Sequence, residues 1–584
     1  MKNFKDYEDQ IINIISRNKV TIISGPTGCG KSTIIPQILS KKFAHKKIVM
    51  IEPRRIAVSS LFNFLQNKIQ NIGYKMRFNK KINKNTKVTI MTDGMFINEL
   101  LDGRLNEYDY VILDEIHERS IRIDCIISIL KNSNWKGKLI LMSATIEQEK
   151  LIKYFNAEVF EFKEKGYKAN VFYEDEPIQD YINESYLKVK KILEEEEKNR
   201  DEIDNIFEDN EEKNKEKKDI LIFLPGEEDI NELFKLLKRI PAIKAYKIHS
   251  TLTDKEQNKI FEETKFKKVI LSTNICETSV TIPGIRYVID CGLYKTKIYD
   301  EIDYMGIKEI TIESAEQRKG RCNRLGEGYC YRLYTEEKYT SLKHNIPEIM
   351  QSDLSYLFLS LIKFGINILN TEYVDKPSLK NVNQSLKFLL QICAITMKNN
   401  IFEITKYGEE LVKLPLDIKM GNFFLTSKKY NCAKHCALLI SVISQENFNF
   451  FEDLKNKKNK DDILYLIDTV EAYLVANNKL DFCREYKLNM KAMIRAELIY
   501  EDLKRRINHK DSDIKNLQKT FCEAFRHNKA QSMKDGSYIM LETQKQIFIH
   551  PKSSYFRKRC KFITFLNVLQ TTKPYAKIIT KFLQ

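Results

Sequence analysis

The sequence has no apolar run that approaches the roughly 20 residues a membrane-spanning helix requires. Its polar start, MKNFKDYEDQ, contains no hydrophobic segment of a secretory signal. The 12 cysteines are scattered without a CxxC pair, and the nearest two, Cys432 and Cys436, are one helical turn apart. These absences argue against a membrane protein and a paired-cysteine zinc site, and they predict an intracellular protein with reduced, mostly buried thiols.

The 584 residues, 43% hydrophobic and 30% charged, are enough for about three to five domains. The net charge of +17 is uneven, because residues 194–219 hold 13 acidic and 6 basic side chains, a local −7 that leaves +24 for the rest. A folded portion this basic suits a polyanion, since neutralising phosphates releases their counterions. A compositional bias towards Lys, Asn and Ile is the alternative explanation, so the motifs must decide.

Short apolar segments alternate with helical patterns in the first 340 residues, which predicts parallel sheets covered on both faces. Such sheets place ligands at the carboxyl ends of their strands. The acidic tract 194–219 is predicted to be a solvated insertion or flexible loop between two sheets of one kind. The predicted strands lie in 20–24, 47–53, 110–115 and 138–145 before this tract, and in 219–230, 268–275 and 287–292 after it.

The strongest local motif is GPTGCGKS, from Gly25 to Ser32, which matches the phosphate-loop pattern GxxxxGK[ST]. It follows a predicted strand and opens a predicted helix, the context in which backbone N–H groups and a helix N-terminus bind phosphate. Lys31 is expected to reach the β- and γ-phosphates of ATP or another NTP, and Ser32 to hold Mg²⁺. The predicted nucleotide-binding residues of this loop are Gly25, Thr27, Gly28, Cys29, Gly30, Lys31, Ser32 and Thr33.

A second motif, Asp-Glu-Ile-His, begins at Asp114 directly after an apolar strand and 83 residues after Lys31. A carboxylate at the end of a strand that faces a phosphate loop suits the Mg²⁺ shell, which is the role predicted for Asp114. Glu115 is placed to orient and deprotonate an attacking water. Alone, the tetrapeptide is also compatible with an exposed turn, but its position favours a catalytic role.

With the phosphate loop, DEIHERS resembles the DEAH/RHA group of superfamily 2 helicases. Further segments resemble the motifs of that family in its own order, and the resemblance covers nearly the whole chain. These segments are EPRRIAV (52–58), MTDGM (91–95), SAT (143–145), LIFLPGEEDI (221–230), HSTLTDKEQNKIF (249–261), STNICETSVTI (272–282) and QRKGRCNR (317–324).

The resemblance implies a role for each matching residue. Arg321 and Arg324 stand where the family has arginine fingers for the γ-phosphate, Gln317 where it contacts the nucleotide and the attacking water, and Phe261 where an aromatic ring stacks on the base. The residues implied to couple nucleotide and RNA are His117, Ser143, Thr145 and Ser279. Those implied to hold the RNA backbone are Arg54, Arg55, Thr92, Asp93, Thr273 and Asn274.

Ordinary structural roles remain open for several of these residues. Arg54 and Arg55 suit solvated cations at a helix start, Phe261 suits a packed core residue, and the loop Ser143–Thr145 suits an interlobe hinge. Three positions depart from the family pattern. Asn323 replaces a glycine, which is tolerable if φ is positive; Pro283 stands near an expected aspartate; and Phe64 is the nearest candidate for an arginine that stacks on the base.

The resemblance also predicts the domain order. The fold class is α/β, with two tandem RecA-like parallel-sheet lobes followed by a winged helix, a helical bundle and a small OB-like β-domain. The segment 293–314 resembles a β-hairpin that protrudes from the second lobe. The predicted boundaries are 1–165 and 166–340 for the lobes, 341–415 for the winged helix, 416–510 for the ratchet-like bundle and 511–584 for the OB-like domain.

The function implied is an ATP-dependent RNA helicase that hydrolyses NTP with Mg²⁺, translocates along single-stranded RNA and unwinds RNA or remodels ribonucleoprotein. The 3′-to-5′ direction is implied by the family resemblance alone. A nucleotide-dependent RNA-binding switch without processive unwinding, and a DNA helicase, stay open as alternatives. The expected partners are RNA, ribonucleoprotein complexes and an activating protein, with no membrane and a monomeric chain. The chain is expected in the nucleus or cytoplasm, the nucleus being slightly favoured.

Overall fold

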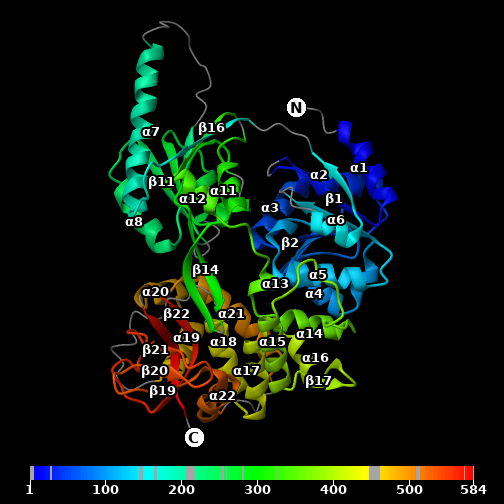
Figure 1. The fold of residues 1–584 in the computed structure, drawn as a ribbon, viewed down its shortest axis with the longest axis vertical. Helices are drawn as coiled ribbons and strands as arrows, with labels where there is room; N and C mark the ends of the chain where they lie inside the picture. Colours follow the sequence, from blue (N-terminus) through cyan, green and yellow to red (C-terminus); the bar gives the residue numbers. More distant parts are fainter. Residues whose placement is uncertain are drawn as a thin grey trace. The chain divides into compact units, whose positions relative to one another are not determined.

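The computed structural model forms two compact units, residues 1–295, 307–350 and 372–376 in the first and residues 296–306, 351–371 and 377–584 in the second (Figure 1). No helix among the described residues is long and apolar enough to cross a membrane. The structure describes residues 5–26, 29–143, 149–162, 167–204, 218–249, 252, 256–257, 259–278, 282–300, 302–324, 326–445, 461–507, 513–570 and 573–582.

The first unit begins with an eight-stranded sheet in which every neighbouring pair is parallel except β3–β4. Its buried strands are short apolar runs, as expected when helices cover both faces. The order is β4 (Asn79–Lys81), β3 (Ile72–Met76), β5 (Val88–Thr92), β2 (Ile48–Glu52), β6 (Tyr110–Leu113), β7 (Lys138–Ser143), β1 (Val20–Ser24) and β8 (Glu158–Glu161).

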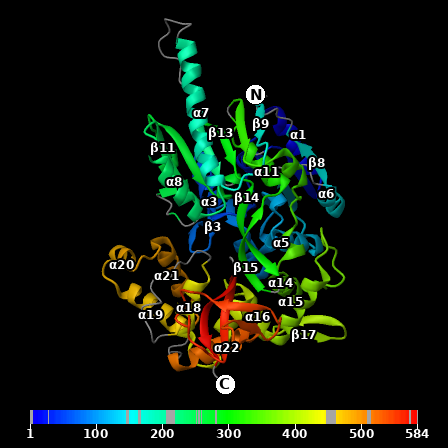
Figure 2. The same cartoon turned by 60° about the vertical axis from the view of Figure 1, so that its left-hand side comes forward.

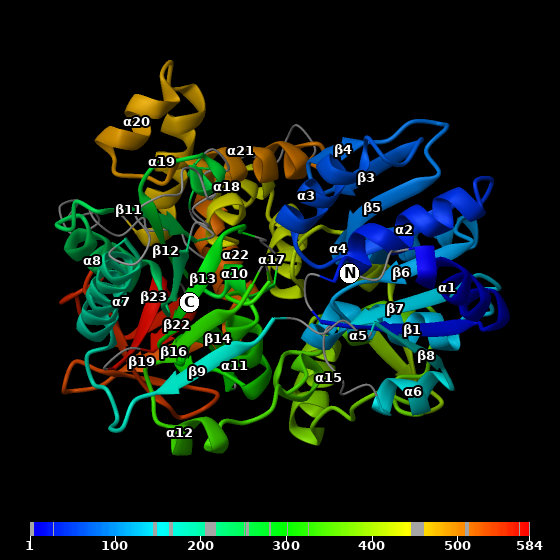
Figure 3. The same cartoon turned by 90° about the horizontal axis from the view of Figure 1, so that it is seen from above.

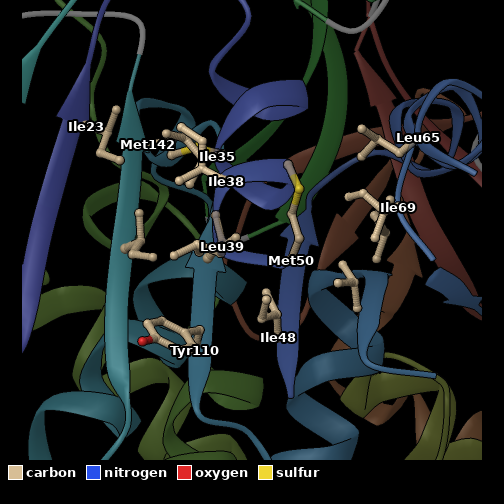
Figure 4. Close-up of a cluster of buried hydrophobic side chains, with 14 of the residues drawn as sticks. Ile23, Ile35, Ile38, Leu39, Ile48, Met50, Leu65, Ile69, Tyr110 and Met142 are labelled. Carbon is tan, nitrogen blue, oxygen red and sulfur yellow. The ribbon is translucent and has the colours of Figure 1, made fainter. Parts of the chain in front are cut away.

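Helices α1 (Lys5–Arg17), α2 (Lys31–Lys42) and α3 (Arg55–Leu65) share one core with this sheet. Figure 4 shows part of that core, where Leu39 of α2 lies among strand residues such as Met50. Alternate strand residues outside this core are also buried, and α4 (Asp93–Leu101) and α5 (Ile121–Asn132) pack against each other. The short elements of this lobe are η1 (Arg104–Glu107), η2 (Ile116–Glu118) and α6 (Glu149–Phe155).

A second, six-stranded parallel sheet follows in the same unit (Figure 3). Its order is β11 (Ile243–Ile248), β12 (Lys267–Ser272), β10 (Asp219–Phe223), β13 (Ile285–Asp290), β16 (Gly328–Arg332) and β9 (Ala169–Tyr173). Apolar residues of α7 (Tyr181–Asp204) and α8 (Glu227–Leu237) share one core with this sheet, and a second core includes Phe223 and Val288. The two RecA-like parallel-sheet domains are thus confirmed. The other helices among the described residues of this lobe are η3 (Lys259–Phe261), α10 (Ile275–Thr278), α11 (Ile312–Lys319), α12 (Glu336–Ser341) and α13 (Glu348–Gln351).

Two sequence expectations require correction. The acidic tract is not simply a loop: residues 194–204 are the end of α7, where apolar side chains such as Val189 and Ile192 fix the helix on the sheet, and Asp219 is a buried strand residue. Residues 205–217 lie outside the described residues. The hairpin is also shorter than 293–314, because β14 (Leu293–Asp300) and β15 (Ile302–Glu309) end before α11, whose start is capped by Thr311.

The second unit is helical before it ends in a closed five-stranded barrel (Figure 2). The barrel confirms the OB-like domain, whereas the winged helix, the helical bundle and all domain boundaries stay predictions. The helical part contains α14 (Ser355–Lys363), α15 (Leu379–Gln391), β17 (Ile395–Lys398), β18 (Ile401–Ile404), α16 (Lys406–Val412), α17 (Ile418–Lys429), α18 (Ala433–Ile443), α19 (Asp462–Val475), α20 (Lys479–Glu485), α21 (Met490–Lys504), η6 (Ile514–Asn516), α22 (Leu517–Ala524) and η7 (Arg526–Asn528). The barrel strands are β19 (Lys529–Ser532), β20 (Tyr538–Met540), β21 (Gln546–Ile549), β23 (Pro574–Lys581) and β22 (Phe562–Gln570).

Two adjacent aspartates tie α19 to this barrel. The carboxylate of Asp462 accepts hydrogen bonds from the Ser553 and Ser554 hydroxyls at 2.7 Å each and from the Ile579 amide at 2.9 Å. Asp461 accepts from the Tyr555 hydroxyl at 2.5 Å. Because buried carboxylates are stabilised only when hydrogen-bonded, these contacts fix the helix on the barrel.

Candidate nucleotide-hydrolysis site

The phosphate loop leaves β1 at the carboxyl end of the sheet, where the Gly25 amide donates to the Ser143 carbonyl at 3.3 Å. Gly30 has φ 90° and precedes α2, so a side chain there would be strained. A Cβ atom on Gly25 would lie only 2.8 Å from Cβ of Phe162, so position 25 also requires a glycine. Thr27 and Gly28 lie outside the described residues.

Lys31, the first residue of α2, is buried. Its ammonium group donates to the carbonyl oxygens of Gly25 at 2.5 Å and Pro26 at 3.0 Å. The cation is therefore held inside the loop that is predicted to surround the phosphates. Cys29, Ser32 and Thr33 are partly buried on the same turn, and the Thr33 hydroxyl donates back to the Gly30 carbonyl at 2.9 Å.

Three carboxylates gather at the ends of β2 and β6. Asp114 is 1% exposed; its Oδ1 accepts from the Glu115 amide at 2.8 Å, whereas its buried Oδ2 has no hydrogen-bond partner among the described residues. Burial and the nearby Asp114 raise the pKa of Glu52 and the pKa of Glu115. A buried oxygen without a partner is costly, so this arrangement fits a cation at Asp114.

Glu52 was not predicted from the sequence as a site residue. The available signal was the one used for Asp114, a carboxylate at the carboxyl end of a buried parallel strand.

His117 joins the two lobes. Its Nε2 lies 2.9 Å from Nε2 of Gln317 on α11, and because an amide nitrogen only donates, His117 accepts and carries its proton on Nδ1. That Nδ1 faces Glu115 at 3.5 Å. Burial lowers the pKa of His117 to about 4, which keeps the ring neutral near pH 7. The structure thus brings together the predicted residues Glu115, His117 and Gln317.

Arg321 follows α11 and is 4% exposed; its guanidinium donates to the Glu277 carbonyl. Burial and the neighbouring charge of Arg324 lower the pKa of Arg321 to about 9, and burial also lowers the pKa of Arg324. The charge of Glu115 opposes both shifts, which places the two guanidinium groups within its electrostatic reach. The charge of Glu115 therefore acts on both predicted arginines.

Arg318, three residues earlier, was not predicted as a site residue. It is fully buried, with Nε 2.8 Å from a Glu277 oxygen and Nη1 2.7 Å from an Asp290 oxygen. Against the effect of burial, these two carboxylates raise the pKa of Arg318. Glu277 thus holds Arg318 through its side chain and Arg321 through its carbonyl. It therefore connects α10 with the turn after α11 that carries Arg321 and Arg324. An arginine beside the predicted fingers was the only sequence signal.

The residues predicted to hold RNA are engaged within the protein in several cases. Arg54 pairs with Glu118 at 2.8 Å, Arg55 donates to the Arg77 carbonyl at 2.8 Å, and Asp93 pairs with Arg122 at 3.5 Å. The other positions differ in exposure. Thr92 is buried, Thr273 is partly buried and Asn274 is exposed.

The other predicted site residues differ in their burial and in their contacts. Phe261 is 47% exposed on η3, so the alternative of a packed core residue is wrong. Ser143 is buried at the end of β7, whereas Thr145 and Ser279 lie outside the described residues. Asn323 does not have a positive φ, so that premise for its tolerance does not apply; its side chain donates to the Tyr167 carbonyl at 2.7 Å.

Two RecA-like sheets, a phosphate loop on the first and paired arginines on the second define a two-lobed P-loop NTPase. Comparison with known proteins agrees: the DEAD/DEAH box helicase model matches residues 5–153, the helicase conserved C-terminal domain residues 198–326 and the OB-fold model residues 517–582. The ATP-dependent RNA helicases DHX33 of Mus musculus and Homo sapiens are each 28% identical to this chain over an alignment 605 residues long. The alignment covers 95% of this chain, 84% of the Mus musculus protein and 83% of the Homo sapiens protein. The chain is thus similar to DEAH/RHA helicases over nearly its whole length, with a DEAD/DEAH box segment, a helicase C-terminal segment and an OB-fold segment in that order.

Proposed function

We propose that this chain hydrolyses ATP to move along single-stranded RNA in the 3′-to-5′ direction, and that this movement unwinds RNA duplexes or remodels ribonucleoprotein. The observation that carries the proposal is the contact between Gln317 of the second lobe and His117 of the first, whose other ring nitrogen lies 3.5 Å from Glu115. Hydrolysis that needs residues of both lobes depends on their approach, and such dependence converts hydrolysis into movement. The curated relatives are named as RNA helicases, which favours RNA as the track.

Each site residue has a role in this proposal. The buried Lys31 binds the β- and γ-phosphates, and Ser32 with Asp114 would hold Mg²⁺, whose charge would offset that of the phosphates. Glu115 orients the attacking water and takes its proton, and Gln317 helps to place that water. Arg321 and Arg324 stabilise the negative charge that develops on the transferred phosphoryl group. The raised pKa of Glu115 matches proton transfer near neutral pH.

Strand displacement and hydrolysis, measured side by side, test the proposal. Wild-type protein is expected to hydrolyse ATP faster with single-stranded RNA than without it, and chelation of Mg²⁺ is expected to stop turnover. Duplexes with a 3′ overhang should be separated faster than duplexes with a 5′ overhang. Hydrolysis at one rate with and without RNA would overturn the motor.

The same assays distinguish the alternatives. RNA-stimulated hydrolysis with no displacement of either duplex would favour a nucleotide-dependent RNA-binding switch. Equal stimulation by single-stranded DNA, together with displacement of DNA duplexes, would favour a DNA helicase.

A further inference from the structure

A short segment that follows α12 and ends at the first residue of α13, residues 343–348 and here named the strap, joins the two lobes beside the hydrolytic residues. At its first end it is bound to α11, the helix that carries Gln317. The Lys343 carbonyl accepts from the Ile312 amide at 3.2 Å. The Glu313 carboxylate accepts from the Asn345 amide at 2.9 Å and pairs with His344 Nδ1 at 2.7 Å.

At its other end the strap is bound to the turn that follows β6. The Asn345 side-chain amide donates to the His117 carbonyl at 3.4 Å, and the Glu348 amide donates to the Arg119 carbonyl at 3.2 Å. The Glu348 carboxylate in turn accepts from the amide of Ile121, the first residue of α5, at 2.9 Å. Three strap hydrogen bonds therefore reach alternate residues, 117, 119 and 121.

The turn between β6 and α5 holds a strained conformation. Glu115 has φ 50° and Arg119 has φ 46°, and neither residue is a glycine, asparagine or aspartate. Residues other than glycine persist in this left-handed region only when the surrounding structure holds them there. The strap supplies part of that restraint on the very turn that carries the predicted hydrolytic carboxylate.

A further anchor comes from residues 372–376. The Arg119 guanidinium donates to an Asp375 oxygen at 2.8 Å, and the same side chain pairs with Asp124 at 2.9 Å. Lys150 also pairs with Asp375. The conformation of Arg119 is thus set through its side chain by Asp375 and through its backbone by the strap.

We propose that Asn345 and Glu348 are positioning residues for ATP hydrolysis: the strap holds the turn after β6 so that Glu115 is aimed at the attacking water, and its attachment to Glu313 links that aim to the placement of α11. The strap touches neither the phosphate loop nor the arginines in any described contact, so it acts through the turn. The inference rests on the proposed hydrolytic function.

The test compares Glu348→Ala with Glu348→Gln, which keeps an oxygen that accepts from Ile121. Glu348→Ala is expected to lower kcat by about 10- to 100-fold, because a displacement of about 1 Å can have an effect of that size, and to leave KM for ATP within about twofold. Glu348→Gln should recover most of kcat. Glu337→Ala is the matched control, since Glu337 is an exposed glutamate of α12 nearby and should behave as wild type.

Amide exchange provides a readout that does not require activity. In Glu348→Ala the Ile121 amide should exchange faster than in wild type, whereas amides of the barrel should not change. Wild-type protein without RNA-stimulated hydrolysis would overturn the proposed function, but faster exchange at Ile121 would still show the restraint. Unchanged exchange would overturn the strap as a restraint whatever the activity.

A second pair of variants tests the link to α11. If the contacts at both ends of the strap act through the same segment, Glu313→Ala and Glu348→Ala should each lower kcat. The loss of kcat in the double variant should then be smaller than the product of the two single losses. Should Glu348→Ala fail to fold, Asn345→Ala, which changes an exposed side chain, takes its place in the same cycle. Unchanged kcat in the folded variants, equal losses in Glu348→Gln and Glu348→Ala, or strictly multiplicative losses would overturn the proposal.

Discussion

The two lobes present opposite charges to each other. The first gathers carboxylates at Glu52, Asp114 and Glu115, and burial raises the pKa values of Glu52 and Glu115. The second presents Arg321 and Arg324, and burial lowers the pKa of each. In both lobes the charged form is disfavoured by its own surroundings. The comparison teaches that each set needs a complement, and a nucleotide triphosphate with a divalent cation carries both signs of charge.

Arg318 provides the contrast within the second lobe. It is as buried as Arg321, but Glu277 and Asp290 neutralise it, and its pKa is raised. Glu277 and Asp290 supply the counter-charge of Arg318, whereas Arg321 donates to the Glu277 carbonyl and would gain a counter-charge from a phosphate. The two guanidinium groups therefore have different tasks although they are three residues apart.

The largest effect is expected from Arg321→Ala, because an arginine that stabilises the transferred phosphoryl group contributes about 10³- to 10⁵-fold to kcat. The measurement is RNA-stimulated ATP turnover at saturating ATP. Arg239→Ala, which removes an exposed arginine just after α8, is the control and should behave as wild type. Wild-type turnover in Arg321→Ala would show that the second lobe does not supply this arginine to the transferred phosphoryl group.

Glu115→Gln is expected to lower turnover by about 10²- to 10⁴-fold, since the amide cannot accept the proton of the attacking water. Nucleotide binding should persist, so the variant should trap bound ATP. Quenched single-turnover assays and equilibrium nucleotide binding measure the two quantities, with Glu107→Gln as an exposed control in the same lobe. Unchanged turnover would remove Glu115 from the mechanism.

Arg318→Met sharpens the contrast with Arg321 through stability. Removing one partner of a buried ion pair costs about 3–5 kcal/mol of unfolding free energy, because Glu277 and Asp290 would be left without their cation. Arg321→Met is expected to leave the midpoint of unfolding unchanged or higher, since it removes a buried charge whose pKa is lowered. Urea unfolding measures the free energy of unfolding of both variants and of the wild type. Equal destabilisation would contradict the distinction.

The smallest effect is expected at the nucleotide base. Phe261→Ala should raise KM for ATP by about 2- to 12-fold, the loss of roughly 0.5–1.5 kcal/mol of aromatic stacking, with little change in kcat. Phe266→Ala is the control, because that ring is similarly exposed in the same lobe. An unchanged KM for ATP would leave Phe261 without a part in nucleotide binding.

Much of the fold was predictable because its signals are local. The phosphate loop, the strand before Asp114 and the alternation of apolar strands with helices are each encoded within a few consecutive residues, and the structure has β1, β6 and both parallel sheets there. The end of the hairpin was mispredicted because the cap at Thr311, which starts α11, outweighs the alternating pattern. The acidic tract was mispredicted because its first residues extend a helix fixed by apolar residues further back, such as Val189.

The sequence alone determined which chemical groups this protein possesses: the lysine of the phosphate loop, the carboxylates at strand ends and the arginines of the second lobe. Only the tertiary structure decided how they are grouped. His117 and Gln317 are 200 residues apart in sequence, and Ile121 and Glu348 are 227 apart, so no local pattern could join them. The same applies to Arg318 and Arg321, whose different tasks follow from which carboxylates the fold places within reach. Motifs specify groups, but burial and neighbouring charge specify what each group does.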